Sequence, residues 1–172
     1  MTKHVTIILH RDELNYDIVS VLHLMSDALP AVEQKHVKHL YNDVLEGENL
    51  YRTMRYTNRA FYECVELLHD LTQVPVSQES TLDNTPGAPE SYEMYLSVNV
   101  DFSKGQVQLL KDLLHDYIVQ YAVNQWLTLI LAQNRSECAE NLYEIRQRIT
   151  QIADSQSKVG RVKAFFCGES TH

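Results

Sequence analysis

The segment from Ser103 to Gln133 is the most apolar part of this chain, and it constrains the fold more than any other feature. Its large apolar residues fall on nearly every turn of an expected helix and lie on most of its sides. A helix of this kind must be covered on most sides. We therefore expect it to form the centre of the fold, with more apolar surface than its neighbours easily cover. The residues concerned are Leu109, Leu110, Leu113, Leu114, Tyr117, Ile118, Tyr121, Trp126, Leu127, Leu129 and Ile130.

Length and charge limit the classes of protein to which the chain can belong. A chain of 172 residues suits a single domain, residues 1–172. The net charge of −8 disfavours a general nucleic-acid binder. Polar residues such as Lys111 and Asp116 interrupt the central helix, so we expect no membrane insertion. Three cysteines, and no apolar run long enough for a signal peptide, indicate a cytoplasmic chain with reduced thiols.

Helix dominates the rest of the pattern. Apolar residues recur at spacings of three and four, in segments that carry helix start and stop residues. Asp12 fits an N-cap, Pro30 a first helical turn and Gly47 a helix end, while Ser103 and Gln106 have the spacing of a capping box. The expected helices cover residues 13–29, 30–46, 48–71, 103–133 and 136–158, and Gly160 ends the last of them.

Short strands complete the predicted fold. Val5, Ile7 and Leu9 alternate with other residues, and the alternation is cleanest over residues 92–102. A last strand is predicted at 161–167. The fold class is therefore mainly α: a helix bundle around a long central helix, with a minor β element of two or three short strands. Such strands form one small sheet or extend the sheet of a neighbouring subunit, because bare edges invite pairing.

Residues 73–91 break the helical pattern. This segment holds three of the four prolines and almost no large apolar residue. Structureless stretches of this length are uncommon inside a compact domain. Two interpretations stay open: a mobile loop, or an arm that becomes ordered on a partner.

The sequence carries no catalytic signature. It has no G-x-S-x-G elbow and no glycine-rich phosphate loop, and its acids are scattered over helix exteriors. His36 and His39 lie three residues apart, but Lys35 and Lys38 flank them and disfavour a bound cation. We predict no catalytic residue, no metal site and no cofactor.

Basic and aromatic residues supply the candidate contact sites. Arg52, Arg55 and Arg59 follow one face of an expected helix, with tyrosines between them. Such a stripe binds phosphates or acidic surfaces, although ion pairs with Glu48 and Glu63 are the simpler explanation. Tyrosine and arginine are also enriched at interfaces. The remaining candidates for an interface or an anionic partner are Tyr92, Tyr95, Arg146, Arg148, Arg161 and Lys163.

Two segments carry a resemblance to a known group of proteins. They are VTIILHRDELNYDIVSVLHLMSD and LLHDYIVQYAVNQWL. The second holds an H-x-Y-[IL]-V…W-[LF] pattern, and both resemble small proteins of phage-like gene clusters in Bacteroidetes. The resemblance implies a virion component of the neck or head–tail connector, a class that forms rings of mostly helical subunits, and it implies no enzyme activity. The matching residues are His115, Tyr117, Ile118, Val119, Trp126 and Leu127.

The function predicted from these features is structural. We expect a non-enzymatic adaptor in a homo-oligomeric assembly, in particular a phage neck or connector ring that contacts neighbouring structural proteins. Such a protein is cytoplasmic during assembly and then part of the virion. Two alternatives are a regulatory or nucleic-acid-associated helical module, and a metal-dependent enzyme built on a helical bundle.

Overall fold

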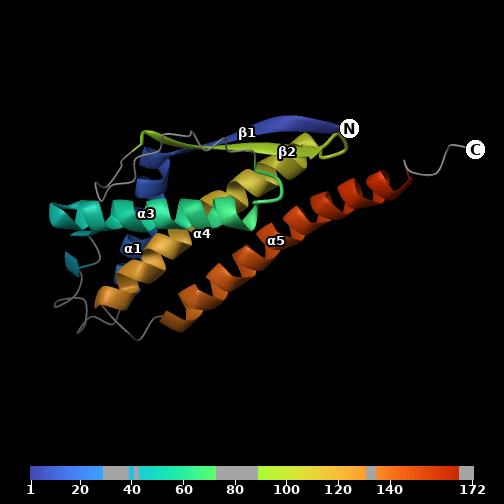
Figure 1. Ribbon diagram of the computed structural model, residues 1–172. Helices are drawn as coiled ribbons and strands as arrows, with labels where there is room; N and C mark the ends of the chain where they lie inside the picture. The colour runs from blue at the N-terminus through green and yellow to red at the C-terminus, as the bar shows by residue number, and fades with distance from the viewer. Residues whose placement is uncertain (29–38, 41–42, 73–88, 131–134, 167–172) are drawn as a thin grey trace, which may run out of the picture.

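The fold was analysed in a computed structural model of the chain, which describes residues 1–28, 39–40, 43–72, 89–130 and 135–166. Side chains of the last helix are described over residues 138–156. Most of the predicted helix at 30–46 and residues 73–88 of the predicted proline-rich arm lie outside these ranges. The elements, shown in Figure 1, are β1 (Thr2–His10), α1 (Arg11–Asp27), the 3-10 turn η1 (Asp43–Leu45), α3 (Glu48–Leu67), β2 (Ser91–Asn99), α4 (Lys104–Ile130) and α5 (Arg135–Phe166).

The fold class is confirmed: the chain is mainly helical, with a small antiparallel sheet. Helix α4 is central, since α1, α3 and α5 all pack against it. Figure 1 shows the two strands lying together along one side of the helices. Helix α5 follows α4 and reaches the sheet, where Asn99 Nδ2 donates to the Gln156 carbonyl at 2.9 Å.

The chain itself covers most of α4. Its middle is buried, and the exposed large apolar residues lie towards its two ends, at Leu109 (43% exposed) and Leu129 (51% exposed). The expectation that α4 leaves much apolar surface uncovered is therefore wrong, because three helices and the sheet enclose it. The buried residues are Leu110, Leu113, Leu114, Tyr117, Ile118, Val119, Tyr121, Ala122, Val123, Trp126 and Leu127.

The capping box predicted for this helix is present. The Gln106 amide donates to Ser103 Oγ at 3.2 Å, and the Ser103 amide donates to Gln106 Oε1 at 2.7 Å. These reciprocal bonds satisfy backbone donors that a helix start leaves without partners. They set the start of α4 immediately after the turn that follows β2.

The sheet pairs strands from distant parts of the sequence. Pairing runs from Thr2 opposite Asn99 to His10 opposite Ser91 without an interruption. The inner face is apolar and buried, as at Ile7, Leu9 and Met94, and it packs onto the helices. Strand β2 ends at Asn99, earlier than predicted, because the next residues form a turn in which the Phe102 amide donates to the Asn99 carbonyl at 3.0 Å.

The C-terminal prediction is wrong. Helix α5 continues through Gly160 to Phe166, so the residues predicted as a last strand at 161–167 are helical up to 166. An internal glycine costs a helix only about 1 kcal/mol, which a long helix tolerates. The sheet correspondingly has two strands in the described part of the chain.

The segment before α3 also differs from its prediction. A helix was expected to reach residue 46, but residues 43–45 form the 3-10 turn η1, whose Val44 carbonyl accepts a bond from Thr53 Oγ1 at 2.8 Å. Gly47 follows with a φ of +51°, in the left-handed region that glycine adopts without a steric cost. Helix α3 can therefore begin directly at Glu48.

Burial of α4 predicts a sharp contrast between two leucines of the same helix. Leu114 is fully buried, whereas Leu109 is 43% exposed. We expect Leu114→Ala to lower the free energy of unfolding by about 2–5 kcal/mol, because it removes packed methyl groups and leaves a cavity. The matched Leu109→Ala change should cost less than about 1 kcal/mol. Urea unfolding monitored by circular dichroism measures both, and equal losses would contradict the central position of α4.

Candidate interaction surfaces

The two edges of the sheet differ. The outer edge of β2 is partly occupied by the chain itself, because the Ser97 amide donates to the Leu71 carbonyl at 2.7 Å and Thr72 forms a bridge with Leu96. The outer edge of β1 pairs with no segment in the described part of the chain. One edge is thus covered locally and the other is open to a partner.

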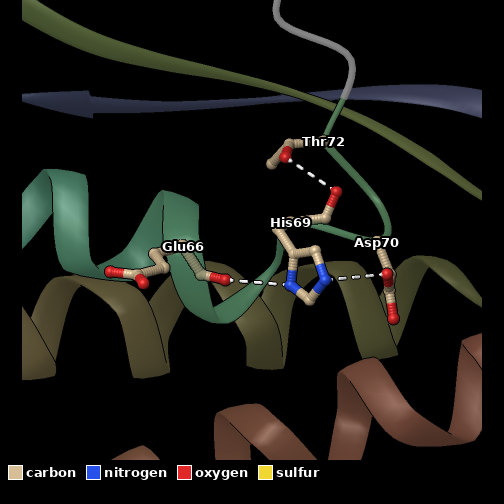
Figure 2. A network of polar contacts seen from close by, with 4 residues as sticks. All are labelled: Glu66, His69, Asp70 and Thr72. Carbon is tan, nitrogen blue, oxygen red and sulfur yellow. Dashed lines mark hydrogen bonds and ion pairs between the residues drawn. The ribbon is translucent and has the colours of Figure 1, made fainter.

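A polar turn places the segment that covers β2. Helix α3 ends at Leu67 instead of continuing to residue 71, and Figure 2 shows the contacts that follow. His69 Nδ1 lies 3.2 Å from the Glu66 carbonyl, His69 Nε2 lies 2.9 Å from Asp70 Oδ1, and Thr72 Oγ1 donates to the His69 carbonyl at 3.2 Å. The ring thus contacts the Glu66 carbonyl in the last turn of α3, a contact that basic side chains commonly make at helix ends. The turn then directs Leu71 and Thr72 towards β2.

The Ser97 bond also fixes the direction of the backbone groups of β1. In an antiparallel pair, opposite residues exchange both of their hydrogen bonds or neither, in alternation. Since the Ser97 amide points away from β1, Ser97 and its partner His4 exchange neither. By alternation, the amides and carbonyls of His4, Thr6 and Ile8 point out from the open edge.

The open edge carries few of the features that prevent strand pairing. It spans nine residues and has no proline and no acid. Its pairing with β2 has no bulge. Lys3 is the single lysine, and its Nζ donates to the Phe102 carbonyl within the chain. On the outer face of the sheet, Ile8 is 39% exposed and Tyr95 is 49% exposed.

The predicted arginine stripe lies on α3 and is exposed at all three positions. No ion pair of these arginines with Glu63 is formed in the described part of the chain, and Glu63 Oε2 accepts the Tyr117 hydroxyl at 2.7 Å. Arg59 lies near the Tyr121 hydroxyl, whose pKa burial raises and the Arg59 guanidinium lowers. Among the described residues, Arg52 and Arg55 form no ion pair.

Four basic residues near the C-terminus were predicted as contact candidates, and the two whose side chains are described, Arg146 and Arg148, do not form a basic patch. Arg146 lines a groove of about 550 Å³ between α3 and α5, where acids outnumber it. Arg148 lies near Asp116. Burial raises the pKa of Asp116 above its usual value, although His115 and Arg148 act in the opposite direction. The side chains of Arg161 and Lys163 lie outside the described residues. The acids of the groove are Glu63, Glu66, Asp70 and Asp154.

The two predicted interface tyrosines have different positions. Tyr92 is 5% exposed, its ring centroid lies 5.0 Å from that of Phe61, and its hydroxyl donates to Asn58 Oδ1 at 2.5 Å. Tyr92 is therefore a core residue that holds the sheet against α3, and it offers a partner no surface. Tyr95 points from the opposite face of β2 and donates to Glu93 Oε2 at 2.5 Å. Tyr95 remains accessible to a partner.

The described residues contain no group of three or more His, Cys, Asp or Glu side chains placed to hold a metal ion. Burial raises the pKa of the Cys64 thiol well above its usual range, as expected for a packing residue. No helix in the ranges described has the length and apolar character needed to cross a membrane. Comparisons with protein-family models, curated proteins and solved structures find no match to this chain.

Sequence reasoning missed two features of these surfaces. The occupied edge of β2 depends on contacts such as the bond between Ser97 and Leu71, residues far apart in the chain, and no local pattern marks it. The link between Tyr117 and Glu63 is equally non-local. By contrast, the alternation of apolar residues in the sequence predicts β1 as a strand, and a strand in a small sheet can have an unpaired edge.

The buried position of Tyr92 predicts a pH-dependent stability. Burial raises the pKa of Tyr92 to about 12, although the nearby Arg11 guanidinium lowers it. Because the folded value exceeds the unfolded value of about 10, the stability that Tyr92 contributes is complete below pH 10 and falls as the pH rises towards 12. We expect Tyr92→Phe to lose about 1 kcal/mol at pH 7 through the missing bond to Asn58.

The difference between Tyr92→Phe and the unchanged chain should shrink above pH 10. Urea unfolding at pH 7, 10 and 11 measures it. Tyr62→Phe is the matched control, since Tyr62 is 70% exposed and should change stability little at any of these pH values. A constant difference across the pH range would contradict the position assigned to Tyr92.

Proposed function

We propose that this chain is a structural adaptor that works by assembling with copies of itself through the open edge of β1. The observation that supports the proposal most strongly is the row of backbone groups at His4, Thr6 and Ile8 that point outward and have no strand beside them in the described part of the chain. A strand added there gains main-chain hydrogen bonds along its length, a recurring mode of protein association.

The resemblance of residues 5–27 and 113–127 to phage-like proteins extends this proposal to a setting. In that setting the chain is a non-enzymatic part of a virion neck or head–tail connector, present in the cytoplasm during assembly. A ring requires a head-to-tail contact between two different surfaces, whereas pairing of identical edges closes after two copies. A ring would therefore need a second contact in addition to β1.

Light scattering coupled to size-exclusion chromatography tests self-assembly. We expect the mass of the unchanged chain to rise above that of one copy as concentration increases. Thr6→Pro should weaken this association at least tenfold, because it removes an outward N–H while the bonds between β1 and β2 involve other residues. Thr6→Val is the matched control and keeps the amide. A single copy at every concentration would contradict the proposal.

A second candidate function is contact with an acidic partner through Arg52 and Arg55. Their exposure, and their lack of an ion pair among the described residues, favour it. Duplex DNA is a suitable polyanion probe, and its binding should weaken steeply with salt.

Fluorescence anisotropy with labelled DNA at low salt tests this second candidate. We expect the double change Arg52→Gln and Arg55→Gln to reduce affinity at least tenfold. Lys104→Gln with Arg148→Gln removes the same charge from α4 and α5 and should change affinity much less. Absence of DNA binding at low salt, or equal losses in both double variants, would remove the candidate.

A further inference from the structure

We propose that the open edge of β1 binds β1 of a second copy of this chain, antiparallel and centred on Thr6. The product is a continuous four-stranded sheet in the order β2, β1, β1, β2, with a two-fold axis beside Thr6. This inference rests on the proposed self-assembly and specifies its surface, its geometry and its register.

The backbone of β1 is prepared for such a partner. The outward groups of His4, Thr6 and Ile8 recur at every second residue, which is the spacing that a further antiparallel strand requires. Pairing with β2 is continuous from Thr2 to His10, so the edge is straight enough to present these groups in one row. A four-stranded sheet also lies within the commonest range of sheet sizes.

The position of Thr6 selects the register. Thr6 is the middle residue of the strand Thr2–His10, so only pairing centred on it uses the whole length of both strands. A shift by one residue would move every side chain to the opposite face. A shift by two residues towards the C-terminus would place His4 opposite His10 and shorten the overlap.

Charge selects the antiparallel direction. The cationic residue Lys3 lies near the beginning of β1, and the strand contains no acid. Antiparallel pairing places Lys3 opposite Leu9 and His4 opposite Ile8 of the second copy. The two Lys3 residues are then six positions apart, about 20 Å along the strand, which exceeds the screening length of about 8 Å at physiological salt. Parallel pairing in register would bring them side by side.

Side chains match across the new junction on both faces. On the outer face, Thr6 meets Thr6 and the exposed Ile8 meets His4; on the inner face, Val5 meets Ile7. Threonine pairs and apolar pairs are favourable neighbours across strands. A second copy is favoured over a different protein because antiparallel pairing with itself keeps the two Lys3 residues apart and places apolar residues opposite each other. The acid-free strand also lets two chains of net charge −8 meet without opposing carboxylates.

Disulfide trapping tests the register in the full-length chain. In a Cys167→Ser background, Thr6→Cys should form a disulfide-linked dimer under mild oxidation, because hydrogen-bonded partners lie about 5.5 Å apart between Cα atoms. His4→Cys and Ile8→Cys are matched controls on the same face and edge. Each should crosslink at least tenfold less by itself, whereas a mixture of the two should yield the linked heterodimer.

Several outcomes separate this inference from self-assembly in general. Dimers by light scattering without a Thr6→Cys crosslink, or efficient self-crosslinking of His4→Cys, would overturn the register and leave the adaptor function standing. A single copy at all concentrations without any crosslink would overturn both. Hydrogen exchange on the unchanged chain is an independent measurement that requires no substitution. The amides of Thr6 and Ile8 should exchange at least tenfold more slowly at high than at low concentration, and unchanged rates would contradict the proposal.

Discussion

Burial of α4 is the constraint on which the rest of the structure depends. A helix with leucine, tyrosine and tryptophan on most sides has to be enclosed, and three helices and a sheet share that task. The enclosure explains why residues far apart in sequence meet. Tyr117 of α4 bonds Glu63 of α3, and Trp126 Nε1 reaches the Leu40 carbonyl at 3.0 Å. These polar ends of buried aromatic rings find partners because an unsatisfied buried donor is costly.

The sheet follows from the same constraint. Burial of Val5, Ile7 and Leu9 is favourable, and β2 supplies a second strand with apolar residues. The two strands together cover one side of the helices with the inner face of the sheet. Two strands are enough to cover that side, but they leave two edges. The two edges differ in their pairing. A polar turn after α3 places Leu71 beside β2, whereas no segment of the described residues pairs with the outer edge of β1. The open edge is thus a consequence of how the core is covered.

Local chemistry explains which parts of the fold could be read from the sequence. The capping box at Ser103 and Gln106 and the alternation in both strands involve neighbouring residues, and the structure contains each of them. Features that depend on contacts between residues far apart in the sequence were either not predicted or predicted incorrectly. Alternation over residues 161–167 suggested a strand, but a strand needs a partner, and α5 continues instead. The prediction that Tyr92 lies at an interface is wrong. Its hydrogen bond to Asn58 and its contact with Phe61 place it in the core, and neither can be inferred from sequence spacing. The exposed apolar surface of α4 is smaller than predicted, because α1, α3, α5 and the sheet bury most of it.

Salt should affect association through the open edge of β1 and association through the exposed arginines of α3 in opposite ways. Two chains of net charge −8 repel each other, and added salt screens that repulsion, so pairing at an uncharged row of backbone groups should strengthen as salt rises. Contact between Arg52 or Arg55 and a polyanion depends on attraction between opposite charges, which the same salt weakens. Backbone pairing at β1 and charge pairing at α3 therefore respond to one variable in opposite directions. Self-association that strengthens as salt rises is therefore consistent with pairing at the edge of β1, and polyanion binding that weakens as salt rises is consistent with contact through Arg52 and Arg55.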